Sequence, residues 1–390
     1  MMNRLKMLVV SGCVSSFGFG ASPLMAKQIA IKADEGRKEK AEIVKNKKTV
    51  EVCFVLDTTG SMSGLIEGAK QKIWSIASQI AQRQDSPKIR FSLVGYRDRG
   101  DKYITSLTDL NEDLDVVHDK LMKFKAAGGG DTPESVNQAL NEAVTKVKWT
   151  EGGDVSRIIF LVGDAPPHMD YEQDVEYKTT CGLAKKKGII INAIQCGNMT
   201  ATIQPWQEIA KLGDGDYIAL PQNGGVVAMS SPQDKRISEL TAELNTSVIP
   251  YGNSERQLQA AWKLSNSLKM IELDVKMNAA RAGCLSSHDG SVKAFLGDND
   301  LVSEWGDKKV TSENIKQDYL PDDYKEMDKD KLVVLLENKI QQRAKIKTEM
   351  DALLDQREKY IAQEMAKMGK DAPAKAFDSN VEKMLKKQIK

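Results

Sequence analysis

The sequence lacks the charge and motif features of nucleic-acid-binding and nucleotide-hydrolysing proteins. Its 390 residues contain 56 basic and 55 acidic side chains. A formal net charge of +1 leaves no excess of positive charge to neutralise phosphates, so we expect no nucleic-acid partner. No Gly-Lys-Ser/Thr motif follows the one glycine-rich loop, which argues against a nucleotide P-loop. Only three histidines are present, so few side chains of that type are available for catalysis or zinc binding.

Long apolar runs are also missing, apart from one near the N-terminus. The basic start MMNRLK precedes an apolar stretch from Met7 to about Gly20, and small residues follow up to Ala26. This pattern predicts a secretory signal peptide over residues 1–26, and the run is too short for a transmembrane helix. The segment ending at Cys13 resembles a lipobox, which leaves lipidation of Cys13 as an alternative. We therefore expect a periplasmic or secreted protein, or a membrane-tethered lipoprotein.

Alternating apolar runs and amphipathic stretches define the middle of the chain. Residues 27–48 are rich in Lys and Glu and predict a solvated leader segment. From residue 49 the pattern predicts buried strands, the first ending at Asp57, that alternate with helices. The further strands are expected at 89–96, 103–107, 157–164, 189–196 and 216–220. The helices are expected after Ser63 and at 111–126, 133–148, 172–187, 203–212 and 231–247. This order predicts an α/β fold with a doubly wound, mostly parallel, Rossmann-like sheet over residues 49–252, closed by the last of these helices.

The remainder of the chain, residues 253–390, predicts a mainly helical extension. A helix is expected at 254–278, a loop-rich connector at 286–323 and a long amphipathic helix at 330–368. The heptad pattern of the long helix slips between Ile340 and Ile346, and Arg357 falls near the apolar seam. Packing on the rest of the protein is therefore favoured over a coiled coil, which stays open as the alternative.

Export would place the cysteines of the mature chain in a compartment where disulfides can form. Cys53, Cys181, Cys196 and Cys284 remain after cleavage at Ala26, and an oxidising compartment permits disulfides. A Cys181–Cys196 bridge is compatible with a helix followed by a strand. Cys53 lies in the middle of a strand, which favours a buried thiol.

The segment Asp57-Thr58-Thr59-Gly60-Ser61 carries the first chemical signal. It begins where a buried strand ends, and ligands of open α/β sheets bind at the carboxyl ends of the strands. A carboxylate with two hydroxyls suits a hard cation such as Mg²⁺, with Mn²⁺ or Ca²⁺ as alternatives. The competing interpretation is that Thr59 and Ser61 cap the following helix.

Two further segments favour the metal. A glycine-rich loop opens a helix and contains Thr132 and Glu134, and a second buried strand ends at Asp164. If the two strands are neighbours, Asp57 and Asp164 face one point, where a cation would relieve their mutual repulsion.

These three segments resemble the metal-ion-dependent adhesion site of von Willebrand factor A (VWA) domains, in the family's order and with similar spacing. The resemblance covers residues 49–252. It implies Asp57, Thr59, Ser61 and Asp164 as ligands, with either Thr132 or Glu134 from the middle loop. It also implies that a partner protein supplies an Asp or Glu to an open coordination position.

Three classes of function are compatible with this pattern. The favoured class is an exported, metal-dependent binding module that is not an enzyme. The alternatives are a metal-dependent hydrolase of the cell envelope and a structural envelope protein with a vestigial metal site. His168, which follows Asp164, is expected at the rim of the site, with catalysis as the alternative, and Arg97 is expected to bind an anionic partner or to form a structural ion pair.

Overall fold

The computed structural model describes residues 48–389 except 65, 67–69, 71–73, 75, 78, 79, 81–86, 131, 223–228, 289–291, 298 and 368–372. The expected signal peptide, the possible lipid site at Cys13 and nearly all of the leader lie outside the described residues. Much of the helix expected after Ser63 also lies outside them. No helix in the described part of the chain is both long and apolar enough to cross a membrane.

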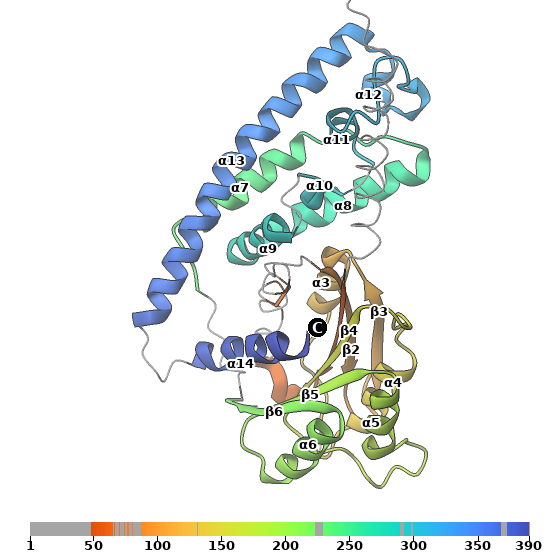
Figure 1. Ribbon diagram of the computed structural model, residues 1–390, viewed down its shortest axis with the longest axis vertical. Helices are drawn as coiled ribbons and strands as arrows, with labels where there is room; N and C mark the ends of the chain where they lie inside the picture. The colour runs from red at the N-terminus through yellow and green to blue at the C-terminus, as the bar shows by residue number, and fades with distance from the viewer. Residues whose placement is uncertain are drawn as a thin grey trace, which may run out of the picture. The chain divides into compact units, whose positions relative to one another are not determined.

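A six-stranded sheet in the order β3-β2-β1-β4-β5-β6 forms the first part of the structure (Figure 1). Only β3 is antiparallel to its neighbour, so the expected mostly parallel sheet is confirmed. The strands are β1 (Thr49–Asp57), β2 (Lys88–Tyr96), β3 (Thr105–Asn111), β4 (Val155–Gly163), β5 (Ile189–Cys196) and β6 (Asp214–Leu220). The chain changes direction across the sheet at β1, which places β1 between β2 and β4.

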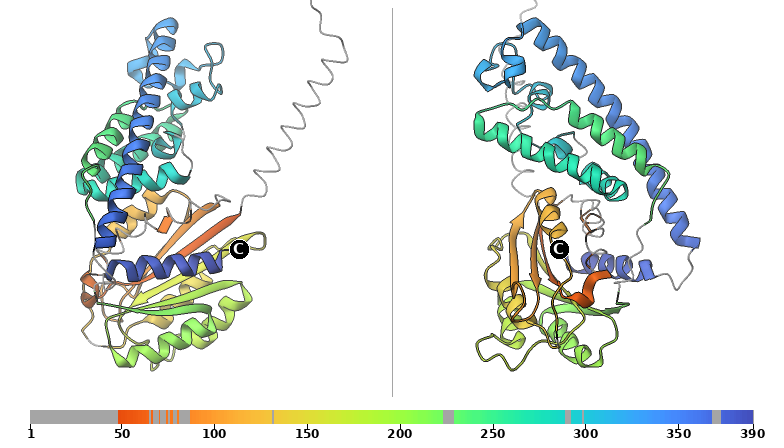
Figure 2. Two further views of the ribbon diagram at one scale, coloured as in Figure 1. Left: turned by 60° about the vertical axis from the view of Figure 1, so that its left-hand side comes forward. Right: turned by 180° about the vertical axis from the view of Figure 1, so that it is seen from behind.

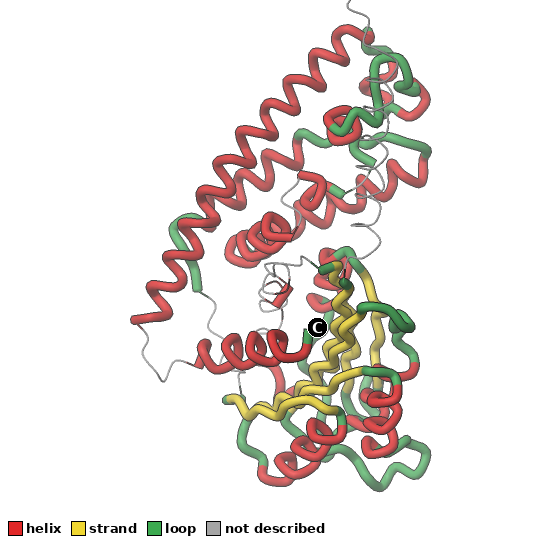
Figure 3. The backbone as a smooth tube through the Cα atoms, viewed as in Figure 1, coloured by secondary structure: helices red, strands yellow, loops and turns green. Residues whose placement is uncertain are grey.

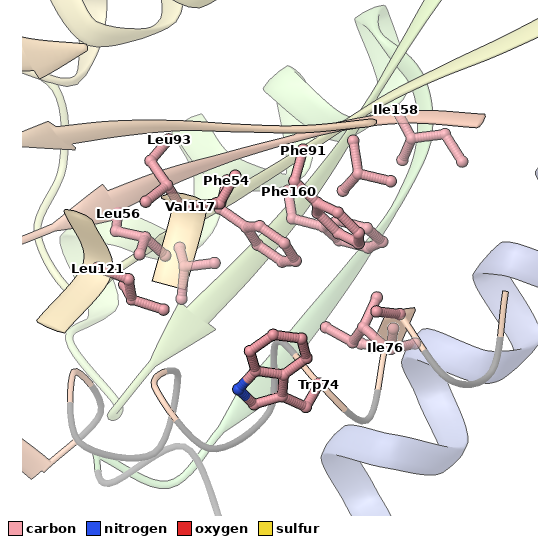
Figure 4. Close-up of a cluster of buried hydrophobic side chains, with 14 of the residues drawn as sticks. Phe54, Leu56, Trp74, Ile76, Phe91, Leu93, Val117, Leu121, Ile158 and Phe160 are labelled. Atoms are coloured by element: carbon pink, nitrogen blue, oxygen red, sulfur yellow. The ribbon is translucent and has the colours of Figure 1, made fainter. Parts of the chain in front are cut away.

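Alternate residues of the strands serve two separate cores, because successive side chains point to opposite faces. On one face Phe54 of β1 stacks between Phe91 and Phe160, beside Trp74 and Ile76 (Figure 4). Helix α3 (Leu114–Met122) packs on this face. The opposite face is covered by α4 (Val136–Thr145), α5 (Tyr177–Lys186) and α6 (Thr200–Leu212).

The second part of the structure is helical, as expected (Figure 3). Its elements are α7 (Asp234–Thr246), α8 (Ser254–Leu273), α9 (Val275–His288), α10 (Val292–Leu296), α11 (Leu301–Gly306), a 3-10 turn η2 (Gln317–Tyr319), α12 (Asp322–Lys325) and α13 (Lys329–Lys367). The single helix expected at 254–278 is divided at Asp274 into α8 and α9. The expected connector at 286–323 contains three short helices and a 3-10 turn. One of these helices, α11, is capped by Asp300, whose side chain accepts a hydrogen bond from the backbone N–H of Ser303.

Helix α7 lies where we expected a closing helix, but its apolar side chains pack in the helical part. Ile237, Leu240 and Leu244 share a core with α9 and α13. Arg357 of α13 bonds to Asp234 of α7 at 2.8 Å, which explains the charged residue near the apolar seam of the long helix.

The last helix, α14 (Pro373–Gln388), packs on the sheet instead, and the sequence analysis did not predict it. Its side chains Val381, Met384 and Leu385 join the core that contains Phe54. Gln388 and Asn192 of β5 exchange two buried hydrogen bonds of 2.8 and 2.9 Å. Figures 1 and 2 show α14 alongside β6, so the chain returns to the sheet after the helical part.

The disulfide between Cys181 and Cys196 that the sequence left possible is not formed. All four described cysteines are buried thiols, including Cys53 as expected. Cys181 lies in the core under α5, and Cys196 lies in the core on the opposite face of the sheet. The sheet therefore separates the two sulfur atoms.

Candidate metal site

The expected metal-binding segments meet at the carboxyl end of β1. Asp57 is the last residue of β1, and Asp164 directly follows β4, the parallel neighbour of β1. This edge lies at the point where the chain changes direction across the sheet, the usual position of a ligand site in this architecture.

The first segment forms a compact group of oxygen atoms. Oδ1 of Asp57 accepts hydrogen bonds from the backbone N–H of Thr59 at 2.8 Å and from its hydroxyl at 2.6 Å. The hydroxyl oxygens of Thr59 and Ser61 are 3.2 Å apart. Thr59 precedes a short 3-10 turn, η1 (Gly60–Met62), but its side chain makes no capping hydrogen bond there. The geometry therefore does not support the interpretation of Thr59 as a helix cap.

Glu134, rather than Thr132, enters the buried site from the middle loop. Glu134 is 2% exposed, and its backbone is bonded to Pro166 and His168 of the loop after β4, whereas Thr132 is exposed. Gly129 has a φ of +74°, and a Cβ there would lie 2.9 Å from Cβ of Thr59 and 3.3 Å from Oε1 of Glu134. Only glycine fits this position, where the loop lies directly against the first segment.

Asp164 has a partner that the sequence analysis missed. The side-chain amide of Gln222 donates to Oδ2 of Asp164 at 2.6 Å and to the carbonyl of Ser61 at 3.3 Å. Gln222 lies just after the carboxyl end of β6, on the edge of the sheet where the site lies. This position was the signal in the sequence that could have identified it. Gln222 thus connects the segment around Ser61 with Asp164, both of which we expected to hold a metal.

The three carboxylates are buried together without a basic partner. Within the described residues, none of Asp57, Glu134 and Asp164 forms an ion pair, and Oδ2 of Asp57 and Oε2 of Glu134 have no hydrogen-bond partner. Burial, with the charge of Asp164, raises the pKa of Asp57 to about 7. Burial, with the charges of Asp57, Asp98, Asp101 and Asp164, raises the pKa of Glu134 to about 9. A bound cation would relieve this repulsion.

The donor set fits a hard cation but depends on hydroxyl oxygens. The described residues contain no group of three or more His, Cys, Asp and Glu side chains placed to hold a metal ion. The hydroxyls of Thr59 and Ser61 would therefore have to be ligands beside the carboxylates, which is the chemistry that Mg²⁺ accepts. Asp57 and Thr59 are buried, whereas Gly60, Ser61 and Gln222 are exposed. The oxygen group is thus accessible from one side.

Arg97, for which an anionic partner and a structural ion pair were both open, has a structural role and forms no ion pair among the described residues. It is buried, and it donates to the carbonyls of Thr58 at 3.2 Å and Lys125 at 2.7 Å. Its guanidinium also lies 4.5 Å from the centre of the Tyr103 ring. Arg97 therefore fixes the backbone next to Asp57.

His168 lies in the loop beside the site, in agreement with the expected rim position. Its Nδ1 is 2.7 Å from Asp170, and its ring stacks on Tyr171 with centroids 4.0 Å apart. Tyr171 and Ser135 both donate to Asp98 at 2.9 Å. These contacts join the loop after β4 to the first turn of α4, close to Glu134.

Comparisons with known proteins agree with this architecture. Residues 51–225 match the family profile of the von Willebrand factor A domain. A ninety-three-residue stretch is 39% identical to von Willebrand factor A domain-containing protein 7 of Rattus norvegicus, covering 23% of this chain and 10% of that protein. An ariadne-like RING finger protein of Acanthamoeba polyphaga mimivirus is 30% identical over 125 residues, which are 32% of this chain and 12% of that protein. The chain thus spans only a small part of these relatives.

Two solved structures are similar at low sequence identity. Proximal thread matrix protein 1 from the mussel byssus has a TM-score of 0.34 and 15% identity, covering 44% of this chain and 42% of that one. The VWA domain of SpRpn10 has a TM-score of 0.34 and 16% identity, covering 45% of this chain and 89% of that one.

Proposed function

We propose that this protein binds a partner protein through a divalent cation, because residues 51–225 match the profile of the von Willebrand factor A domain, a type of domain that generally mediates protein–protein interactions. The cation is Mg²⁺, or Mn²⁺ or Ca²⁺, and its ligands are Asp57, Thr59, Ser61, Glu134 and Asp164. One observation carries the proposal: three carboxylates are buried at the carboxyl edge of the sheet, two of their oxygens lack a hydrogen-bond partner, and no basic side chain of the described residues pairs with them.

The residues around the site prepare it to hold a cation. The two hydrogen bonds from Thr59 fix the carboxylate of Asp57, and Gln222 fixes that of Asp164. Arg97 holds the backbone of Thr58 in place through its carbonyl. Such supporting hydrogen bonds orient the ligands of a metal and strengthen its binding.

The partner is a protein that presents an Asp or Glu side chain. When bound, the cation would be the largest local charge of the site, and an anionic oxygen of the partner would fill its open coordination position. Gly60, Ser61 and Gln222 are exposed around the site, so an incoming side chain can approach from their side.

Binding is favoured over catalysis because of the position of the nearby histidine. Nδ1 of His168 lies 2.7 Å from Asp170 and Nε2 lies 3.4 Å from Asp98, so both ring nitrogens face carboxylates that are not among the proposed ligands. A hydrolase would need a base positioned beside a metal-bound water.

The test is a pull-down from envelope extracts with the wild-type protein and the Asp57→Asn variant, each in Mg²⁺ and in EDTA. Asp119→Asn, which changes a partly exposed carboxylate on α3, is the matched control. We expect Mg²⁺-dependent capture of a partner by the wild type and the control, and no capture by Asp57→Asn. Capture that persists in EDTA would contradict the proposal, and metal-dependent turnover without a stable partner would favour the hydrolase.

We also propose that the protein is exported, on the evidence of its N-terminal sequence. N-terminal sequencing of the mature protein should begin at Lys27. A mature protein that begins at a lipidated Cys13 would indicate the tethered form, and an intact Met1 in the cytoplasm would contradict export.

A further inference from the structure

A row of residues in register across the sheet brings Tyr96 under the proposed metal site. Tyr96, the last residue of β2, is paired with Asp57 of β1. Leu56 is paired with Val162, so the next residue of β4, Gly163, lies beside Asp57. In parallel strands, residues in register project to the same face of the sheet. Tyr96 belongs to the core on the α4 side, and Glu134 immediately precedes α4.

The hydroxyl of Tyr96 reaches across Asp57 to β4. A Cβ on Gly163 would lie 2.3 Å from this hydroxyl oxygen and 3.1 Å from Cβ of Asp57. The same point is 3.1 Å from the ring of Trp206, so the space is enclosed. The absence of a side chain at Gly163 is therefore what allows the phenol to lie beneath the two aspartates.

This hydroxyl is fully buried and has no hydrogen-bond partner in the described part of the chain. Buried tyrosine hydroxyls normally find a partner, because an unmade hydrogen bond in the interior is costly. Oδ2 of Asp57, the residue in register with Tyr96, and Oε2 of Glu134 are also buried without a hydrogen-bond partner among the described residues. A buried donor thus lies beside a residue that carries a buried, unpartnered acceptor.

We propose, on the basis of the function proposed above, that Tyr96 is a positioning residue of the cation site. Because its hydroxyl has no direct partner in the described part of the chain, it donates to one water, which in turn donates to the carboxylates of Asp57 and Glu134. Through this water it orients both carboxylates from below, as Gln222 orients Asp164 from the exposed side.

A tyrosine hydroxyl is protonated at neutral pH, because the ordinary pKa of this group is about 10. It can therefore donate a hydrogen bond, and it adds no negative charge to the three carboxylates. A neutral donor suits this position, where a cationic side chain would compete with the metal.

The competing explanation is that Tyr96 only packs in the core and does not influence the cation site. The Tyr96→Phe variant distinguishes the packing role from the positioning role. It removes one oxygen atom and leaves the ring in place. Tyr217→Phe is the matched control, because the hydroxyl of Tyr217 donates to Gln195 at 2.6 Å and is not enclosed with the carboxylates. For each variant, Mg²⁺ and Mn²⁺ affinity is measured by calorimetry, and thermal unfolding is measured in EDTA.

We expect Tyr96→Phe to weaken Mg²⁺ binding about tenfold, the usual size of such a supporting contact, without lowering the unfolding temperature in EDTA. Tyr217→Phe should lower the unfolding temperature and leave the affinity unchanged. As a second readout, Mg²⁺ should change the near-ultraviolet tyrosine absorption of the wild type, and Tyr96→Phe should lose this change.

Two results would overturn the inference, and they are distinguishable. If Tyr96→Phe binds Mg²⁺ as tightly as the wild type while Asp57→Asn does not bind it, the role of Tyr96 is refuted and the proposed cation site stands. If the wild-type protein takes up neither Mg²⁺ nor Mn²⁺, the proposed function and the role of Tyr96 both fail.

Discussion

The Arg281→Met variant should strongly destabilise the protein, because Arg281 neutralises a buried carboxylate of the sheet part. Nε and Nη2 of Arg281 on α9 bond to Asp115 of α3 at 2.5 and 2.7 Å, and Nζ of Lys263 on α8 lies 2.6 Å from the same carboxylate. The side chains of Asp115 and Arg281 are 1% and 0% exposed. Although burial alone would raise it, these two cations hold the pKa of Asp115 well below its usual range.

Removing one partner of a buried ion pair costs about 3–5 kcal/mol, a large part of the roughly 5–15 kcal/mol that stabilises a typical domain. We expect a loss of this size for Arg281→Met in urea unfolding followed by circular dichroism. The double variant with Asp115→Asn should lose less than the sum of the two single variants, because the buried charge is then absent. Arg236→Met, which breaks exposed pairs on α7, should cost under about 1 kcal/mol. If Arg281→Met lowers the free energy of unfolding as little as Arg236→Met does, the assigned role of the buried pair is refuted.

Three further changes test other parts of the structure. Burial lowers the pKa of His118 from 6.5 to about 4, so between these pH values the unfolded chain binds more protons than the folded protein. The free energy of unfolding should therefore decrease by up to about 3 kcal/mol as the pH is lowered through this window. His118→Phe should reduce this decrease, as measured by urea unfolding midpoints, and an unchanged decrease would contradict the assignment. Leu385→Ala should cost about 2–5 kcal/mol in urea unfolding if α14 packs on the sheet, whereas a cost below 1 kcal/mol would place α14 elsewhere. Gly163→Ala should lower the unfolding temperature because its Cβ would lie 2.3 Å from the Tyr96 hydroxyl, and Tyr96→Phe should partly restore it; no restoration would argue against this contact.

The sheet could be predicted because its strands are buried on both faces. A parallel strand covered by helices on each side needs an almost continuous apolar run, and β1, β4 and β5 each contain one. The same runs located the strand ends, so the positions of Asp57 and Asp164 followed directly. Their convergence also followed, because β1 and β4 are neighbours.

The placement of α7 and α14 could not be predicted, because both helices have an apolar face that fits more than one surface. The apolar periodicity of Ile237, Leu240 and Leu244 identifies a buried face but does not identify what buries it. The partner of α14 is 196 residues away in sequence, as the pair Asn192–Gln388 shows. Such long-range packing leaves no local signal.

In the site, the sequence identified the proposed ligands but not the residues that contact them. Thr132 and Glu134 were equivalent as oxygen donors in sequence, and only the fold of the Gly129 loop separates the exposed side chain from the buried one. Gln222 and Tyr96 were not identified, because an amide after one strand and a tyrosine at the end of another have ordinary structural roles. Both gain their role from the order of the strands in the sheet.

Anomalous diffraction from crystals soaked in MnCl₂ tests the proposed cation site most directly. We expect one manganese peak within bonding distance of Ser61 and of at least one of the carboxylates Asp57, Glu134 and Asp164, and its loss in Asp57→Asn. A map from the wild-type protein at saturating Mn²⁺ with no peak beside Asp57 would contradict the proposal.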